Sequence, residues 1–410
     1  ANEEAIAHFD SALKLLDTLP DGPDRAEREL ALQLGVAVPL QWARGFAAPE
    51  LERATVRARE LCDEVRDPSQ MFAALAQLTL FYATRPDYHL SLELAEQLDE
   101  LAAGADDPSL TAAVSFLKTW PLLNVGRLTD AVESAEQAMA AYDPVRNAAT
   151  AYTFGFDLGV LNLAFESWSL WLLGFPERAR RELDRGLALA RELGHPHTTA
   201  FIQVAACELY WFLRDPAAVD RYTEELAPLA DEKGFIYWQA HAAFYRAERM
   251  VREGQVRAGI AQMDQAIAGM KATGTETCLT RLFTRMTDTC RRARAIDEAA
   301  AANRAALEIM QKYDERYMEA EIYRHRGDLL LLSGGGHAEA EADFELAIKT
   351  ARLQHAKVLE LRAAMSIARL WESQGKNAAA RERLAEIYGR FTEGFDTRDL
   401  EEAELLLESL

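Results

Sequence analysis

A pattern that recurs about every 40 residues constrains this chain more than any other feature. Each copy has a small residue, a large residue four positions later and another small residue three positions after that, as in Ala179, Leu183 and Gly186. The first residues of seven successive copies are separated by 48, 40, 40, 40, 41 and 40 positions. These first residues are Ala131, Ala179, Val219, Gly259, Ala299, Ala340 and Ala380. A regular period of this length indicates supersecondary units stacked along one axis rather than a single compact core.

The spacing within each copy is typical of a tetratricopeptide-type (TPR) helical hairpin. In four copies a glycine stands five residues before the first small residue, where the tight turn between two helices is expected: Gly126, Gly174, Gly254 and Gly375. HEAT and armadillo repeats have similar lengths but lack this placement of glycine and small residues. The period near 40 exceeds the usual TPR length of about 34 residues, so each helix should be somewhat longer. Two weaker copies have Arg214 and Arg294 at the turn position.

The predicted fold class is therefore an all-α solenoid, a right-handed superhelix of about ten TPR-like hairpins. Ala, Leu, Glu and Arg dominate the composition, prolines number only 13, and no long stretch shows the alternation of a strand. In the N-terminal third, less regular copies begin at Ala5, Ala54 and Ser91. The copy at Ala5 lacks a preceding first helix and the chain lacks an initiator methionine. We therefore expect a fragment that begins inside a hairpin.

Two interruptions of the period suggest how the array is divided. The first contains the turn cluster Pro20 to Pro23, and the second contains the segment Tyr152 to Gly159, with two glycines among four aromatic residues. This second segment is too apolar for a free linker and is expected to be a packed loop. We expect an N-terminal sub-array at residues 1–150, a C-terminal sub-array at 151–396 and a capping helix at 397–410. Thr397 is the predicted N-cap of that last helix.

Charge and cysteine usage exclude several classes of function. The chain has 45 basic and 66 acidic residues, a formal charge of −21, which opposes general nucleic-acid binding and favours basic or neutral partners. No apolar run of about 18 residues is available to span a membrane. The acidic start lacks the apolar core of a signal peptide. The four cysteines show no C-x-x-C spacing, so reduced thiols and a cytoplasmic location are expected.

Five segments together resemble a known family of repeat regions. They are residues 172–176, 192–196, 319–330, 361–371 and 391–397. The chain resembles the C-terminal TPR region of large bacterial signalling proteins with a STAND-type ATPase module, often fused to a class III adenylate or guanylate cyclase domain or to a kinase domain. The resemblance covers nearly the whole chain. It implies a sensor and regulatory scaffold of a neighbouring ATPase or nucleotide cyclase.

The catalytic motifs of such parent proteins have no counterpart in this chain. There is no G-x-x-x-x-G-K-[ST] phosphate loop, because residues 375–377 read Gly-Lys-Asn without the upstream glycine. Neither G-x-S-x-G nor H-E-x-x-H occurs. The close pair His195 and His197 would need two or more further ligands in space to bind a metal, and the triple glycine at 334–336 is expected to be a turn. We expect no catalytic residues, no metal site, no cofactor and no enzymatic activity in this segment.

The predicted binding surface is the concave groove that first helices line in TPR arrays. Each first helix has a small residue where it touches the second helix of its hairpin. Counted from that residue, four positions of each first helix are expected to face the groove. The aromatic residues at these positions are Phe116, Trp120, Trp168, Trp171, Phe201, Trp211 and Phe244. An acidic ladder in 40-residue steps follows, consisting of Glu208, Glu248, Asp288 and Asp328. Aromatic anchors beside carboxylates favour a basic or amphipathic peptide or protein segment, including one from the parent's own ATPase module.

Three alternatives stay open at the level of sequence. The tryptophans could fill the core while the acids pair with Arg281, Arg291 or Arg324. The array could be a structural or oligomerisation arm with no ligand in its groove. It could also be an enzyme whose site becomes visible only when scattered residues converge in space.

Overall fold

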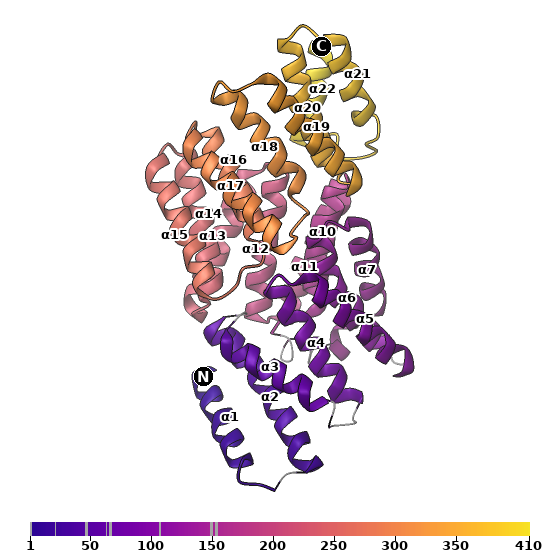
Figure 1. The fold of residues 1–410 in the computed structure, drawn as a ribbon, viewed down its shortest axis with the longest axis vertical. Coiled ribbons are helices and arrows are strands. Elements are labelled where there is room, and N and C mark those ends of the chain that lie inside the picture. The colour runs from indigo at the N-terminus through magenta and orange to yellow at the C-terminus, as the bar shows by residue number, and fades with distance from the viewer. Residues whose placement is uncertain are drawn as a thin grey trace.

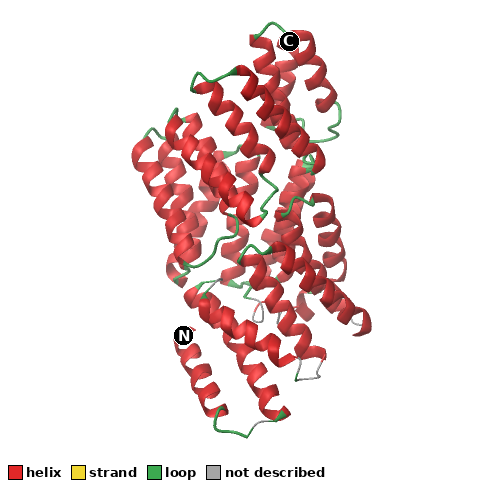
Figure 2. Ribbon diagram, in the orientation of Figure 1, coloured by secondary structure: helices red, strands yellow, loops and turns green. Residues whose placement is uncertain are grey.

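The computed structural model describes residues 2–20, 22–45, 48–62, 64, 68–105, 108–147, 151 and 155–410. Throughout these ranges the regular secondary structure is helical and no strand occurs (Figure 2). Consecutive helices pack in pairs, and the pairs stack into an elongated array (Figure 1). The predicted all-α, TPR-like solenoid is therefore confirmed.

The helices follow the period expected from the sequence. The N-terminal part of the array contains α1 (Asn2–Leu16), α2 (Pro23–Arg44), α3 (Pro49–Cys62), α4 (Pro68–Thr84), α5 (Tyr88–Ala105), α6 (Pro108–Asn124), α7 (Leu128–Ala141) and the short α8 (Pro144–Asn147). The C-terminal part contains α10 (Leu158–Leu172), α11 (Pro176–Leu193), α12 (Pro196–Phe212), α13 (Pro216–Lys233), α14 (Ile236–Arg252), α15 (Val256–Ala272), α16 (Leu279–Arg292), α17 (Ile296–Tyr313), α18 (Glu319–Leu332), α19 (His337–Leu353), α20 (Lys357–Ser373), α21 (Asn377–Tyr388) and α22 (Arg398–Ser409). Helices α2, α4 and α6 and the even-numbered helices from α10 to α20 are the first helices of hairpins, and α1 packs against α2.

The turns within hairpins adopt a left-handed backbone conformation. Gly174 and Gly254 lie at turn positions with φ of 90° and 93°, a region that glycine enters without steric cost. Arg214 and Arg294 occupy the equivalent positions of two other hairpins with φ of 60° and 61°. The backbone thus adopts the same turn even where the sequence signal is weak, because the packing of the two flanking helices fixes it.

Small residues lie where the two helices of a hairpin touch. Ala131, Ala179 and Ala380 are fully buried, as the repeat pattern predicts. At Gly259 an added Cβ would lie 2.7 Å from the carbonyl oxygen of Ala247 on the preceding helix. The close approach of the helices therefore requires the small side chain that recurs every 40 residues.

Segments about 190 to 220 residues apart also contact each other. The Tyr88 hydroxyl lies 2.9 Å from the Thr277 hydroxyl, and the two residues are 189 positions apart. The Glu177 backbone N–H donates to Glu393 over 2.8 Å, with a separation of 216 positions. Inner helices contact as well, because α10 packs against α20. Hairpins that are about five repeats apart therefore close over one another, and part of the concave face becomes interior.

One apolar cluster continues across the expected division near residue 150. It includes Leu123 of α6 and Leu161 of α10. The division into two sub-arrays stays a prediction. Within the expected packed loop, residues 152–154 lie outside the described residues, whereas Phe156 is buried against His197 and Phe201. The loop is shorter than expected because α10 already begins at Leu158.

The N-cap residues of α10 and α22 differ in whether their side chains accept a hydrogen bond from a backbone N–H of the first helical turn. The Asp157 carboxylate accepts a hydrogen bond from the Val160 backbone N–H at the start of α10, a side-chain cap that the sequence analysis missed. Thr397 does precede α22, but its hydroxyl donates to the Gly394 carbonyl instead of accepting from the helix. The last helix packs against α20 and α21.

Candidate functional site

Seven of the eleven predicted groove residues pack within the array. These are Phe116, Trp120, Trp168, Trp171, Phe201, Glu208 and Phe244; Trp120 is half-buried and the other six are buried. The Trp168 indole N–H donates to the Ala205 carbonyl over 3.1 Å, and Trp171 stacks on Phe212 with ring centroids 4.5 Å apart. The expectation of an open aromatic groove is thereby corrected.

Arginines from α16 and α20 cover the aromatic side chains. The Arg281 guanidinium lies 4.8 Å from the centre of the Trp168 ring, and Arg362 lies 4.9 Å from that of Trp171. Both contacts join helices that are several hairpins apart in sequence. The superhelix is therefore too tightly wound for these tryptophans to face an open channel, and they are part of the interior.

The predicted acidic ladder is matched by arginines along its whole length. Glu208 lies 3.4 Å from both Arg281 and Arg285, and Arg285 also pairs with Glu248 at 2.5 Å. Asp288 pairs with Arg291 at 2.7 Å. The structure thus supports the alternative in which arginines neutralise the ladder.

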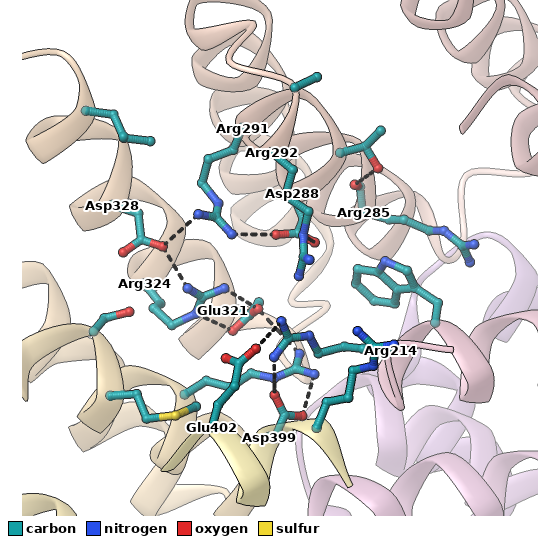
Figure 3. Close-up of a pocket in the computed structure, with 18 of the residues that line it drawn as sticks. Arg214, Arg285, Asp288, Arg291, Arg292, Glu321, Arg324, Asp328, Asp399 and Glu402 are labelled. Atoms are coloured by element: carbon teal, nitrogen blue, oxygen red, sulfur yellow. Dashed lines mark hydrogen bonds and ion pairs between the residues drawn. The ribbon is translucent and has the colours of Figure 1, made fainter. Parts of the chain in front are cut away.

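The last ladder residue takes part in a second set of ion pairs. Asp328 lies 2.7 Å from Arg324 and 3.6 Å from Arg291, which reaches across from α16 (Figure 3). Burial alone would raise the pKa of Asp288, but the neighbouring Arg292 and Arg291 hold it well below its ordinary value. A carboxylate held in this way stays ionised and is fully committed to the protein's own arginines.

A cavity of about 960 Å³ opens beyond the aromatic interior. It is lined by the C-terminal end of α12, by α14, α16, α18, α20 and α22, and by adjoining turns, so several successive first helices contribute to one site. Four predicted groove residues line it, namely Trp211, Glu248, Asp288 and Asp328. Its volume lies at the upper end of the range of about 300–1,000 Å³ that is common for ligand pockets.

Basic side chains outnumber acidic ones in the lining of this cavity. Among the described residues, nine arginines line it: Arg214, Arg252, Arg285, Arg291, Arg292, Arg324, Arg362, Arg369 and Arg398. Seven carboxylates line it: Asp215, Glu248, Asp288, Glu321, Asp328, Asp399 and Glu402. The whole chain has the opposite balance, with 45 basic and 66 acidic residues. The cavity is therefore a local concentration of positive charge in an acidic protein.

Arg362 connects the cavity to the aromatic interior. Its guanidinium pairs with Asp399 of α22 at 2.8 Å and donates to the Phe212 carbonyl at the end of α12, also over 2.8 Å. It lies 3.5 Å from Glu321 of α18. The Arg362 side chain of α20 thus contacts residues of α12, α18 and α22.

Arg214 makes a parallel connection from the turn after α12. It lies 2.7 Å from Glu402 and 3.4 Å from Asp399, so the last helix is held by two arginines from different parts of the array (Figure 3). Arg214 and Arg362 were not among the site residues predicted from the sequence. An arginine one helical turn from an acidic residue, as Arg324 is from Glu321, is a sequence signal for an ion pair. Arg362 gives no such signal, because its partners Asp399 and Phe212 are 37 and 150 positions away.

The histidine pair and the triple glycine lie at helix ends and in turns between helices. Gly194 ends α11 in the left-handed region and α12 begins at Pro196. His197 is buried against Phe156, and burial lowers the pKa of its imidazole to about 3. Among the described residues no three His, Cys, Asp or Glu side chains gather as metal ligands. Residues 334–336 form the turn between α18 and α19.

The fold and the inner cavity define an α-solenoid of TPR-like hairpins with a closed superhelical turn. No family model matches the chain. A curated relative, the uncharacterized protein R02095 of Rhizobium meliloti (strain 1021), is 20% identical over 292 residues. The match covers 71% of this chain and 28% of that relative, so the chain spans under a third of the relative's length.

Comparison with solved structures shows the fold. A Rap protein complexed with competence and sporulation factor superposes with a TM-score of 0.56 and 14% identity, covering 92% of this chain and 94% of that protein. Aspartyl phosphate phosphatase F from Bacillus subtilis gives a TM-score of 0.46 at 12% identity, with coverages of 88% and 93%. A STAND protein with a tetratricopeptide repeat sensor from Pyrococcus horikoshii gives 0.39 at 10% identity, with coverages of 97% and 67%. Within the described residues, no helix combines the length and apolar character needed to cross a bilayer.

Proposed function

We propose that this chain is a ligand-binding sensor module that holds a peptide or protein segment in the cavity between α12 and α22. The observation that carries the proposal is the cavity of about 960 Å³ lined by the inner helices of successive hairpins. A TPR-like array of this kind also occurs in a Rap protein that was crystallised with a bound factor. Concave surfaces built by several repeats are the usual binding sites of solenoids.

The ion pairs around the cavity give a physical route from binding to regulation. Arg214 and Arg362 hold α22 against the turn after α12. A ligand that contacts these helices changes the free energy of their mutual packing, and it shifts the array toward whichever arrangement it binds more tightly. The module would in this way report the presence of its ligand as a change of superhelical shape.

The proposal extends to a larger signalling protein. The curated relative is more than three times as long as the matching segment, since the match covers 28% of it. The resemblance to the repeat region of STAND-type proteins supports an ATPase or a nucleotide cyclase as the regulated neighbour. The repeat segment itself performs no chemical step in this proposal, so the purified chain should release no phosphate from ATP and form no cyclic nucleotide.

A peptide-display selection tests the binding role. A random decapeptide library is selected on the immobilised chain, and recovered peptides are measured by calorimetry against the chain and two variants. Leu332→Trp fills the cavity from a partly exposed lining position, and the matched control Leu353→Trp adds the same ring at an exposed position outside it. Peptides should bind the chain and the control alike and lose affinity for Leu332→Trp. Recovery of no peptide, or equal binding to all three proteins, contradicts the proposal.

A further inference from the structure

We infer that the ligand of this cavity is an acidic peptide segment, whose carboxylates meet arginines at the rim and whose apolar side chains meet the wall formed around Trp211. The inference rests on the proposed function and assigns it a charge opposite to the basic segment expected from the ladder. It follows from which charged groups in the cavity are already paired and which are left for a ligand.

Six of the seven carboxylates that line the cavity pair with the protein's own arginines, and the seventh, the exposed Asp215, accepts a hydrogen bond from the Ala218 backbone N–H at the start of α13. Burial alone would raise the pKa of Glu321, but Arg324 holds it well below its ordinary value, and Arg362 lies nearby. Asp399 accepts two hydrogen bonds from the Arg362 guanidinium, over 3.1 and 2.8 Å. A basic ligand would have to displace buried arginines from these carboxylates, which would leave charges unpaired in a poorly hydrated site.

Several arginines, by contrast, keep donors that face the cavity. Arg369 is 52% exposed and its only ion partner among the described residues is Glu402, at 3.6 Å. Arg398 is exposed, lines the cavity and forms no ion pair within the described part of the chain. Arg292 is 52% exposed and uses its Nε atom on Asp288. These three guanidinium groups are the available partners for ligand carboxylates, and planar donors of this kind bind carboxylates in bidentate fashion.

The apolar part of the lining sets the second requirement on the ligand. Trp211 is half-buried and lines the cavity together with Leu331, Met365 and Leu370. Aromatic and aliphatic surface next to these exposed guanidinium groups fits a segment that alternates acidic and apolar residues. The amphipathic character expected from the sequence is therefore kept, while its charge is reversed.

The position of Glu402 connects this recognition to the last helix. Arg214 and Arg369 both contact this carboxylate, at 2.7 and 3.6 Å. A ligand carboxylate that reaches the same arginines competes with Glu402 and weakens the hold on α22. Binding of an acidic segment should thus loosen the contact between the C-terminal helix and the turn after α12.

A charge-matched pair of variants tests the inference. Arg369→Glu with Arg398→Glu reverses two of the three available cations of the cavity. Arg257→Glu with Arg304→Glu makes the same change in net charge at exposed positions on α15 and α17 that do not line the cavity. The probes are a synthetic decapeptide of alternating Glu and Leu, the same peptide with Lys in place of Glu, and inorganic phosphate. Affinity is measured by fluorescence anisotropy of labelled peptides, with phosphate as a competitor, at two salt concentrations.

The acidic peptide should bind at least about tenfold more tightly than the basic one, and added salt should weaken it. The cavity variant should reduce its affinity by about tenfold or more, whereas the surface control should change it less than about twofold. Tight binding of the basic peptide that depends on the cavity would overturn the charge assignment and leave the binding role intact. Phosphate that displaces the peptide at low millimolar concentration would show a small-anion site instead of a peptide site.

The display selection separates the two claims independently. Cavity-dependent peptides are those that bind the chain but lose affinity for Leu332→Trp. If they are rich in Asp and Glu, they support both the binding role and the acidic character of the ligand. Cavity-dependent peptides that are neutral or basic keep the proposed function and overturn the charge inference. Failure to recover any cavity-dependent peptide overturns the proposed function itself.

Discussion

The aromatic interior around Trp168 and Trp171 and the arginine-lined cavity beside it come from the same inward positions of neighbouring repeats, yet one is sealed and the other is open. In the interior, Trp171 is 2% exposed and stacks between Phe212 and Arg362. In the cavity, Trp211 is half-buried and lines empty space. A repeat position therefore predicts the direction of a side chain but not whether another turn of the superhelix will cover it.

The largest expected effect comes from removing an aromatic ring from the sealed region. Trp171→Ala leaves a cavity next to Phe212 and removes the ring on which the Arg362 guanidinium packs. It should therefore lower the free energy of unfolding by about 3–5 kcal/mol. Trp211→Ala, at a partly open position, should cost less than half of that. Urea denaturation followed by circular dichroism measures both. Equal costs would show that the two regions are packed alike.

Arg362 stands at the border of the two regions and gives the next largest effect. Arg362→Met leaves the buried Asp399 with Arg214, at 3.4 Å, as its remaining ion partner among the described residues, and should destabilise the chain by about 3 kcal/mol. Asp399→Leu in addition removes the orphaned charge, so the double variant should be more stable than Arg362→Met alone. A double-mutant cycle in urea measures the coupling. Additive costs would mean that the pair does not connect α20 to α22.

A buried carboxyl that interacts with Arg281, the arginine that covers Trp168, predicts a dependence of stability on pH. Burial raises the pKa of Glu315 to about 8, so the folded chain keeps a proton that the unfolded chain releases near the ordinary carboxyl pKa of about 4.3. The contribution is fully present below that ordinary value and is lost as the pH rises through about 8. Glu315→Gln should therefore reduce the loss of unfolding free energy between about pH 5 and pH 8 by at least about 1 kcal/mol.

The control for this pH effect is Glu308→Gln, which removes an exposed carboxyl of α17. It should leave the pH profile of the unfolding free energy unchanged. Buried His197, whose pKa burial lowers to about 3, favours the opposite trend at acid pH, but it is present in every variant and cancels in the comparison. A profile for Glu315→Gln that parallels the unaltered chain would place this carboxyl in contact with water.

The smallest effect on stability is expected in the open region. Arg369→Glu with Arg398→Glu should change the free energy of unfolding by less than about 0.5 kcal/mol per site, because exposed or weakly paired charges contribute little. Its effect should appear in ligand affinity instead. A melting temperature lowered as much as by Trp171→Ala would show that these arginines support the fold.

The candidate site was only partly predictable from the sequence. Glu248, Asp288 and Asp328 were expected on the inner face and do line the cavity. Their partners were only partly foreseen: Arg291 and Arg324 lie three and four positions from an acid, whereas Arg285 reaches Glu248 from another hairpin. Contacts within one helix follow from its period, but contacts between hairpins depend on the pitch of the array.

The hairpins of this protein can be predicted from its amino-acid sequence. Small residues and turn glycines recurring every 40 positions report the tight contact inside each pair of helices, which is local and is therefore written into each repeat. The tightness with which the pairs wind becomes visible in the folded array alone. That winding sums small rotations over about five repeats, and no single repeat encodes it. It buries Trp168 and Trp171, pairs the ladder with arginines from distant helices, and leaves one positively charged cavity open.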